Sequence, residues 1–305
     1  MSNPLSPLPI FEPRLVRAHR ERAAPGLADH DFLFREVAER LADRLPDIKR
    51  NFPLALDIGC HGGEFGQIVG RRGGIETLIQ CDPAPAMAQH AGGLAVAADA
   101  DALPFRKSVF DLVVSVLSLH WVNDLPGALL QIRRVLKPDG LFLAALPGGG
   151  TLGELRAALL EAELEVTGGA SPRVAPFVDL RDAGALLQRA GFALPVADAD
   201  PIGVRYENMF RLMADLRGMG ETAAMTDAPR HFTRRAVIMR AAEIYRQRHA
   251  GSDGRIPATF QVVWLTGWAP DPSQQGPAQR GSATARLADA LKAGESEPGE
   301  GNGHA

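Results

Sequence analysis

The sequence has few cysteines, no long apolar run and no strong excess of charge of either sign. Its two cysteines, Cys60 and Cys81, are too few for a disulfide framework or a four-ligand zinc site, and they favour a reducing compartment. No apolar run approaches the about 20 residues of a membrane-spanning helix, and the proline-rich start lacks the apolar segment of a secretory signal. We therefore predict a cytoplasmic protein without a membrane span.

The charge balance is close to neutral. The chain has 33 lysine and arginine residues against 36 aspartate and glutamate residues, which gives a formal net charge of −3. Domains that bind nucleic acid are usually basic, because they must neutralise phosphates. The sequence therefore predicts no nucleic-acid partner, whereas the charge balance does not argue against a protein partner.

Composition divides the chain into three parts. Residues 1–30 form an N-terminal arm with arginines at positions 14, 17, 20 and 22. These arginines are interpreted as a solvated helix face, or as groups that cover a ligand site or guide an anionic partner. Residues 270–305 have no aromatic and too few aliphatic side chains to offset the entropy of ordering, which predicts a disordered tail with one short helix near Ser282. A single domain is expected over residues 31–269, with a helical insertion at about 206–250.

Short apolar runs alternate with helical patterns between the two ends. Strands are predicted over 54–58, 77–81, 94–98, 110–117, 140–146, 193–204 and 258–268, and helices over 125–136, 152–166, 179–190, 206–218 and 233–248. Runs without polar alternation, such as 110–117, are typical of strands buried on both faces. This order predicts an α/β fold with a Rossmann-like, doubly wound and mostly parallel sheet, in which a helical insertion precedes the last strand. The last strand is expected to close the sheet on the side opposite its start.

A glycine-rich segment after the first strand carries the strongest chemical signal. Gly59, Cys60, His61 and Gly63 stand between that strand and the next helical pattern. Glycines there let the backbone approach a ligand closely, and the helix N-terminus offers unpaired N–H donors. His61 occupies the second glycine position of the dinucleotide fingerprint G-x-G-x-x-G. A tight structural turn is the alternative interpretation.

Two carboxylates follow the next two strands. Asp82 lies 23 residues after Gly59, and Asp99 follows the third strand. The first spacing suits a carboxylate that accepts both hydroxyls of a ribose, and ligands of α/β sheets bind at the carboxyl ends of strands. Asp99 is placed to accept from the amine of an adenine. Each aspartate has a simpler interpretation as a helix N-cap.

Several motifs accompany the glycine-rich segment. They are Asp57-Ile58-Gly59-Cys60-His61-Gly62-Gly63, Cys81-Asp82-Pro83, Asp99 with Leu103-Pro104-Phe105, Phe110-Asp111-Leu112-Val113-Val114-Ser115, and Leu136-Lys137-Pro138-Asp139-Gly140. Together they resemble the class I S-adenosylmethionine (SAM)-dependent methyltransferases of type 11, and more distantly the malonyl-acyl-carrier-protein methyltransferase of biotin synthesis.

Three later segments are more similar to the methyltransferase-fold assembly factors of respiratory complex I, which are arginine hydroxylases, and to their bacterial relatives. They are Ser118-Leu119-His120-Trp121-Val122-Asn123-Asp124-Leu125-Pro126, Arg217-Gly218-Met219-Gly220-Glu221-Thr222, and Thr259-Phe260-Gln261 with Gly267-Trp268. The resemblance spans about residues 11–275. It implies SAM as cofactor and an iron–sulfur subunit of complex I as the protein acceptor.

The resemblance also implies which residues bind SAM. Asp57, Gly59, Cys60, His61 and Gly63 would wrap its amino-acid and ribose parts, and Asp82 would bind the ribose. The remaining cofactor residues that it implies are Asp99 and Ala100 at the adenine, Met87 on the adenine face and Ser115 near the sulfonium. Met87 has an alternative interpretation as ordinary helix core.

Candidate residues for binding and activating the acceptor are also predicted. His120 is the candidate acid–base residue and Trp121 a candidate pocket wall, although both residues could instead fix their loop by packing. The insertion from Tyr206 to Thr222 is interpreted as a lid or acceptor platform, which makes Tyr206, Asp215 and Glu221 candidate substrate residues. The two carboxylates could hold a cationic acceptor such as a guanidinium by charge-assisted bonds. Solvated helix or loop charges are the alternative for Asp215 and Glu221.

Two functions are therefore expected from the sequence. The first is methyl transfer from SAM to a protein side chain, a carrier-bound acyl group or a small acid, and the second is arginine hydroxylation by a SAM-binding assembly factor. His19 and Glu21 form only half of an iron-binding 2-His-1-carboxylate set, so no metal site is predicted. A nicotinamide dehydrogenase is disfavoured, because His61 breaks the fingerprint and no second catalytic domain is evident.

Overall fold

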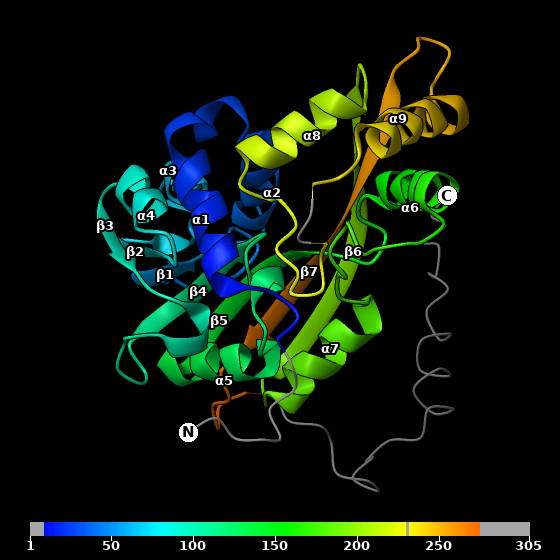
Figure 1. The fold of residues 1–305 in the computed structure, drawn as a ribbon. Coiled ribbons are helices and arrows are strands. Elements are labelled where there is room, and N and C mark those ends of the chain that lie inside the picture. The colour runs from blue at the N-terminus through cyan, green and yellow to red at the C-terminus, as the bar shows by residue number, and fades with distance from the viewer. Residues whose placement is uncertain (1–8, 230–231, 275–305) are drawn as a thin grey trace, which may run out of the picture. The chain divides into compact units, whose positions relative to one another are not determined.

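The computed structural model describes residues 9–229 and 232–274 (Figure 1). The chain forms two compact units, residues 1–271 and 272–305. The helix expected near Ser282, and the predicted disordered tail from residue 275 onward, lie outside the described residues. Within the described ranges, no helix combines the length and the hydropathy that crossing a membrane requires.

The first unit is built on one seven-stranded sheet with the order β3-β2-β1-β4-β5-β7-β6. Its strands are β1 (Leu54–Ile58), β2 (Thr77–Asp82), β3 (Leu94–Ala97), β4 (Phe110–Val116), β5 (Leu136–Pro147), β6 (Ala193–Tyr206) and β7 (Ile256–Trp268). The first five are mutually parallel, and β7 is antiparallel to β5 and β6. The predicted Rossmann-like, mostly parallel α/β fold is confirmed.

Helices cover both faces of the sheet (Figure 1). They are α1 (Pro13–Ala23), α2 (Phe32–Ala42), α3 (Glu64–Val69), α4 (Pro85–Ala91), α5 (Leu125–Val135), α6 (Gly153–Thr167), α7 (Leu180–Arg189), α8 (Met209–Gly218) and α9 (Arg235–His249). One buried cluster joins α2, α3, α6, α8 and α9 to one face, and a second joins α5 and α7 to the other. Burial on both faces explains why β4 reads as a continuous apolar run.

Three predicted elements differ from the observed ones. The final strand β7 does not lie at the edge, because it pairs with β5 on one side and with β6 on the other. The fifth strand begins at Leu136 and not at Gly140, since Phe110 pairs with Leu136 before a register shift in β4. Tyr206 ends β6 in register with Ile256, so the following helix begins only at Met209.

The chain reverses its direction of progress across the sheet between β1 and β4. From β1 it proceeds outward to β2 and β3, and then returns to β4 on the other side. In open α/β sheets, such a switch point leaves a crevice at the carboxyl ends of the strands, where ligands bind. The loops that follow β1, β2 and β4 therefore enclose the candidate site.

Candidate functional site

The loop between β1 and α3 approaches the loop after β4 very closely. Gly59 and Gly63 have φ values of +68° and +82°, in the left-handed region that favours glycine. A Cβ atom on Gly59 would lie 1.8 Å from Ser118 Oγ. Only glycine at this position therefore permits the observed approach of the two loops.

Asp57, one residue before the end of β1, has a buried carboxylate. The residue is 1% exposed, and within the described part of the chain neither carboxylate oxygen has a hydrogen-bond partner. Burial raises the pKa of Asp57, and the charges of Glu64 and Asp82 raise it further. Because an unpaired buried acceptor is costly, this carboxylate fits a ligand that donates hydrogen bonds.

Asp82, at the end of β2, is fully buried and already has several donors. Its Oδ2 accepts from Arg20 Nη1 at 2.8 Å and from the backbone N–H of His61 at 3.3 Å. Its Oδ1 accepts from the N–H of Ala84 at 2.9 Å. Burial raises the pKa of Asp82, and these donors offset part of that rise.

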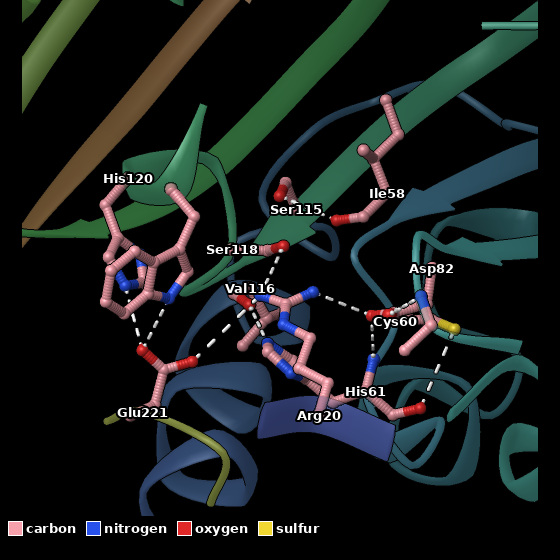
Figure 2. Close-up of polar contacts among 12 residues, drawn as sticks. Arg20, Ile58, Cys60, His61, Asp82, Ser115, Val116, Ser118, His120 and Glu221 are labelled. Atoms are coloured by element: carbon pink, nitrogen blue, oxygen red, sulfur yellow. Dashed lines mark hydrogen bonds and ion pairs between the residues drawn. The ribbon is translucent and has the colours of Figure 1, made fainter. Parts of the chain in front are cut away.

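Arg20 extends from α1 into the crevice (Figure 2). The residue is 1% exposed. Its Nη2 donates to Ser118 Oγ at 3.0 Å and lies 4.0 Å from Glu221 Oε1. Of the two interpretations of the arm arginines, Arg20 follows the second, because its guanidinium covers the crevice at the end of β2.

His61 and its neighbours pack behind the glycine loop. The His61 ring stacks on Phe34 with centroids 4.0 Å apart, and its Nε2 contacts the carbonyl oxygen of Val116 at 3.0 Å. Burial lowers the pKa of His61 to about 3, so the ring is neutral at physiological pH. Cys60 is also buried, and its Sγ lies 3.8 Å from the His61 carbonyl oxygen.

The remaining residues implied for the cofactor have local roles as well. Ser115 donates through Oγ to the Ile58 carbonyl at 2.7 Å, which ties the end of β4 to β1. Met87 lies within the main hydrophobic cluster, as its alternative interpretation expects. Asp99 is exposed and accepts from the N–H of Asp101 at 3.3 Å, so it is also a cap. Asp99 and Ala100 line a small void of about 50 Å³.

A larger cavity of about 510 Å³ lies on the other side of Trp121. Its wall is mainly apolar. Its larger apolar residues include Leu33, Phe34, Leu117, Leu155, Leu159, Phe177, Phe210, Met213, Leu216, Ile238, Phe260 and Val262. His120, Trp121 and Glu221 line the same cavity, and among the described lining residues Glu221 alone bears a carboxylate.

His120 and Trp121 hold the Glu221 carboxylate in a fixed orientation. Its Oε2 accepts from Trp121 Nε1 at 2.8 Å and lies 2.9 Å from His120 Nε2 (Figure 2). The His120 contact and the Arg20 charge hold the pKa of Glu221 at about 2 despite burial. The carboxylate is therefore ionised throughout the neutral range. Its Oε1 accepts no hydrogen bond in the described residues.

Tyr206 and Asp215 are placed elsewhere. Neither is among the residues that line the cavity. Asp215 Oδ1 lies 2.8 Å from His30 Nδ1, and burial together with Asp215 raises the pKa of Tyr206. The structure thus brings Glu221, His120 and Trp121 together and leaves the other two candidates on α8 and at the end of β6.

Taken together, the crevice residues fit the SAM molecule that the sequence resemblance implies. The glycine loop provides close backbone approach, and Asp57 provides an unpartnered acceptor. Asp99 borders an open void, whereas Asp82 has an oxygen for a ribose only once Arg20 releases it.

Sequence reasoning did not assign Ser118 or Phe34 to the site, and it left Arg20 among four equivalent arginines. A signal for Arg20 exists in the helix pattern. Val16, His19, Arg20 and Ala23 are the buried residues of α1, and they follow the i, i+3, i+4, i+7 spacing of one helix face.

Glu64 provides a prediction about stability. Burial raises its pKa from 4.5 to about 7, so the folded state holds a proton that the unfolded state has released between these pH values. The stabilisation is fully present below pH of about 4.5 and is lost as the pH rises to about 7, by up to about 3 kcal/mol. Glutamine has no proton to release, so the stability of Glu64→Gln relative to wild type should rise when the pH is raised from 5 to 8. Urea unfolding at both pH values measures this difference. An equal difference at both pH values would contradict the prediction.

Known proteins with similar sequences include arginine-hydroxylases and methyltransferases. Residues 56–144 match the family model described as a methyltransferase domain. The chain is 45% identical over 284 residues to the mitochondrial arginine-hydroxylase NDUFAF5 of Homo sapiens. This match covers 91% of this chain and 82% of that protein. It is 34% identical over 263 residues to the malonyl-[acyl-carrier protein] O-methyltransferase of Halorhodospira halophila, with 84% of this chain and 87% of that protein covered.

The solved structures that resemble this chain support the fold. The YcgJ protein of Bacillus subtilis matches with a TM-score of 0.53 at 15% identity, over 77% of this chain and 98% of that chain. A phosphoethanolamine N-methyltransferase of Haemonchus contortus matches with a TM-score of 0.51 at 16% identity, over 84% of this chain and 60% of that chain.

Proposed function

The chain belongs to the class I SAM-dependent methyltransferase family, and we propose that it binds SAM in the crevice and acts on a guanidinium group of a protein partner. The observation that carries the choice of acceptor is Glu221. This ionised carboxylate is fixed by His120 and Trp121 at the inner wall of the apolar cavity, with Oε1 accepting no hydrogen bond in the described residues.

In the crevice, the glycine loop from Gly59 to Gly63 and the Asp57 carboxylate would hold the amino-acid part of SAM. Asp82 would accept from its ribose, and Asp99 with Ala100 would bind the adenine. Bound SAM would supply an activated methyl group on a sulfonium, from which the neutral thioether departs readily as the leaving group. The protein then needs mainly to position the acceptor, because in-line geometry contributes most of the rate.

The charge of the cavity favours a cationic acceptor over a carboxylate. Arg173 lines the cavity, but its Nη2 lies 2.6 Å from Glu163 Oε1, which neutralises it. Arg217 is exposed on α8, where solvent screens its charge. Glu221 alone among the described lining residues carries a carboxylate, and its Oε1 lies 4.0 Å from Arg20 Nη2 in the crevice. This supports a guanidinium, the group in the name of the arginine-hydroxylase relatives, over the malonyl group of the O-methyltransferase relatives.

His120 is positioned to take a proton from the acceptor. Because its Nε2 faces the Glu221 carboxylate, we assign the ring hydrogen to Nε2, which leaves Nδ1 as the acceptor. In the described residues, the buried Nδ1 has no partner. Glu221 thus orients the imidazole and also balances the positive charge that develops on it.

Hydroxylation of the same arginine is the second candidate. The 45% identity to an arginine-hydroxylase favours it. It would use the same guanidinium site and would require O2 together with a two-electron reductant, with one oxygen atom inserted into a C–H bond of the arginine and the other released as water. The protein partner implied by the sequence resemblance, an iron–sulfur subunit of complex I, is the acceptor to examine first. A cytoplasmic location stays a prediction.

Mass spectrometry of that subunit tests the proposal. The subunit is purified from cells that contain the protein and from cells that lack it, and its arginine-containing peptides are compared. A gain of one methyl group supports methyl transfer, and a gain of one oxygen supports hydroxylation. Unmodified arginines in both samples would contradict an arginine acceptor in this subunit. Calorimetric titration with SAM and S-adenosylhomocysteine tests the cofactor separately.

A further inference from the structure

The crevice assigned to the cofactor contains a side chain of the protein itself. The Arg20 guanidinium bridges the acid at the end of β2 and the loop after β4, with 2.8 Å to Asp82 Oδ2 and 3.0 Å to Ser118 Oγ (Figure 2). The void beside it measures about 50 Å³. Pockets that enclose drug-sized ligands measure roughly 300 Å³ or more. A nucleoside therefore enters only if this guanidinium moves.

From this conflict, and on the basis of the proposed function, we infer that Arg20 is a latch that competes with the cofactor for Asp82. In the closed state, both Asp82 oxygens are occupied, by Arg20 and by the N–H groups of His61 and Ala84. A ribose that donates two hydroxyls displaces the guanidinium. The latch lowers cofactor affinity, because binding includes the cost of breaking a buried ion pair.

Glu221 is the second partner that the released guanidinium needs. Arg20 Nη2 already lies 4.0 Å from Glu221 Oε1, the oxygen that accepts no hydrogen bond within the described part of the chain. A buried guanidinium without a counterion is strongly unfavourable. A short swing from Asp82 to Glu221 avoids that state, so the latch opens without leaving the charge alone. The acceptor guanidinium uses the same Glu221 oxygen, so in the complete complex the two guanidinium groups would share this carboxylate, whose oxygen has two lone pairs.

The latch is part of a larger lid. The segment before α1 contacts the loop that carries Glu221: the N–H of Glu12 donates to the Ala224 carbonyl at 2.8 Å, and Phe11 forms a β-bridge with Met225. On α1, His19 Nδ1 lies 3.1 Å from the Thr222 carbonyl oxygen. The arm and this loop are therefore joined, and motion of Arg20 is coupled to the position of the acceptor carboxylate.

Calorimetric titration with S-adenosylhomocysteine tests the latch. Arg20→Met removes the competing cation and is expected to bind about tenfold more tightly than wild type, about the effect of one charge-assisted hydrogen bond. Arg22→Met, an exposed arginine on the same helix, is the matched control and should bind as wild type does. Weaker binding by Arg20→Met would identify Arg20 as a cofactor ligand and overturn the latch. Unchanged binding would also overturn the latch, because no competition would be removed.

Two further variants sharpen the test. Arg20→Gln keeps a hydrogen-bonding group and serves where Arg20→Met folds poorly, as judged by circular dichroism. Glu221→Gln is expected to weaken binding about threefold or more in the wild-type background, because the released guanidinium loses its second partner. In the Arg20→Met background it should change nothing, and equal weakening in both backgrounds would overturn the exchange. If no variant and no wild-type protein binds, the cofactor assignment fails and the latch with it.

Discussion

Asp82→Ala is expected to lower the free energy of unfolding, but by less than the about 3 to 5 kcal/mol that removing one partner of a buried ion pair usually costs, because Glu221 Oε1 lies 4.0 Å from Arg20 Nη2 and remains as a counterion. The substitution leaves the Arg20 guanidinium, which is 1% exposed, without its nearest carboxylate. The same variant is expected to give no heat on titration with SAM, because the ribose loses its acceptor. Urea unfolding measures the first effect and calorimetry the second.

The double variant Arg20→Met with Asp82→Ala separates the two effects. It removes both members of the pair, so it should recover much of the stability that Asp82→Ala loses. It should still fail to bind SAM, although no latch competes in it. Equal instability of the single and double variants would show that the ion pair is not what Asp82 contributes, and SAM binding by the double variant would exclude the ribose contact.

Glu221→Gln is expected to reduce kcat/KM for modification of the protein acceptor by about 100-fold, measured at SAM concentrations that saturate the variant. Glutamine retains the shape and accepts from Trp121 Nε1, which lies 2.8 Å from Glu221 Oε2, but it removes the negative charge. A guanidinium then loses its charge-assisted bond, and His120 loses the charged group that orients its imidazole.

The matched control is Glu207→Gln, an exposed carboxylate that pairs with Arg211 on α8 at 3.8 Å. A surface pair of this kind contributes little, so its activity should stay within about twofold of wild type. Because the pKa of Glu221 is about 2, activity should not titrate through this group between pH 5 and pH 9. Wild-type activity in Glu221→Gln would show that the acceptor is not held by this charge.

The strands that local patterns define were the most predictable part of the fold. β1, β2, β3 and β4 lie within a residue or two of their predicted ranges, since each is a short apolar run bounded by turn residues. The order of the last strands was not predictable in the same way. Placing β7 between β5 and β6 depends on pairs such as Leu146 with Val263, which are far apart in sequence, and no local pattern records which edge a strand joins.

In the candidate site too, local patterns predict some residues and fail to predict others. The glycine loop, Asp82 and Asp99 were found because they follow strands, and all parallel strands end at one edge of the sheet. Arg20 was not distinguished from the other arm arginines, and Ser118 was not assigned to the site, since the partners of Arg20 lie 62 and 98 residues away in sequence. Tyr206 and Asp215 were expected beside Glu221 only because they share one insertion, and a shared insertion does not fix which way each side chain faces.

The sequence by itself therefore determined the class of fold and the position of the glycine and carboxylate residues at the carboxyl edge of the sheet, where we propose that the cofactor binds. These features follow from local periodicity and from the spacing of turns, which are properties of short segments. Only the tertiary structure decided that Glu221 joins His120 and Trp121, and that Arg20 closes the crevice on Asp82. Those contacts depend on how separate segments pack, and burial of a charge is a property of the packed surroundings.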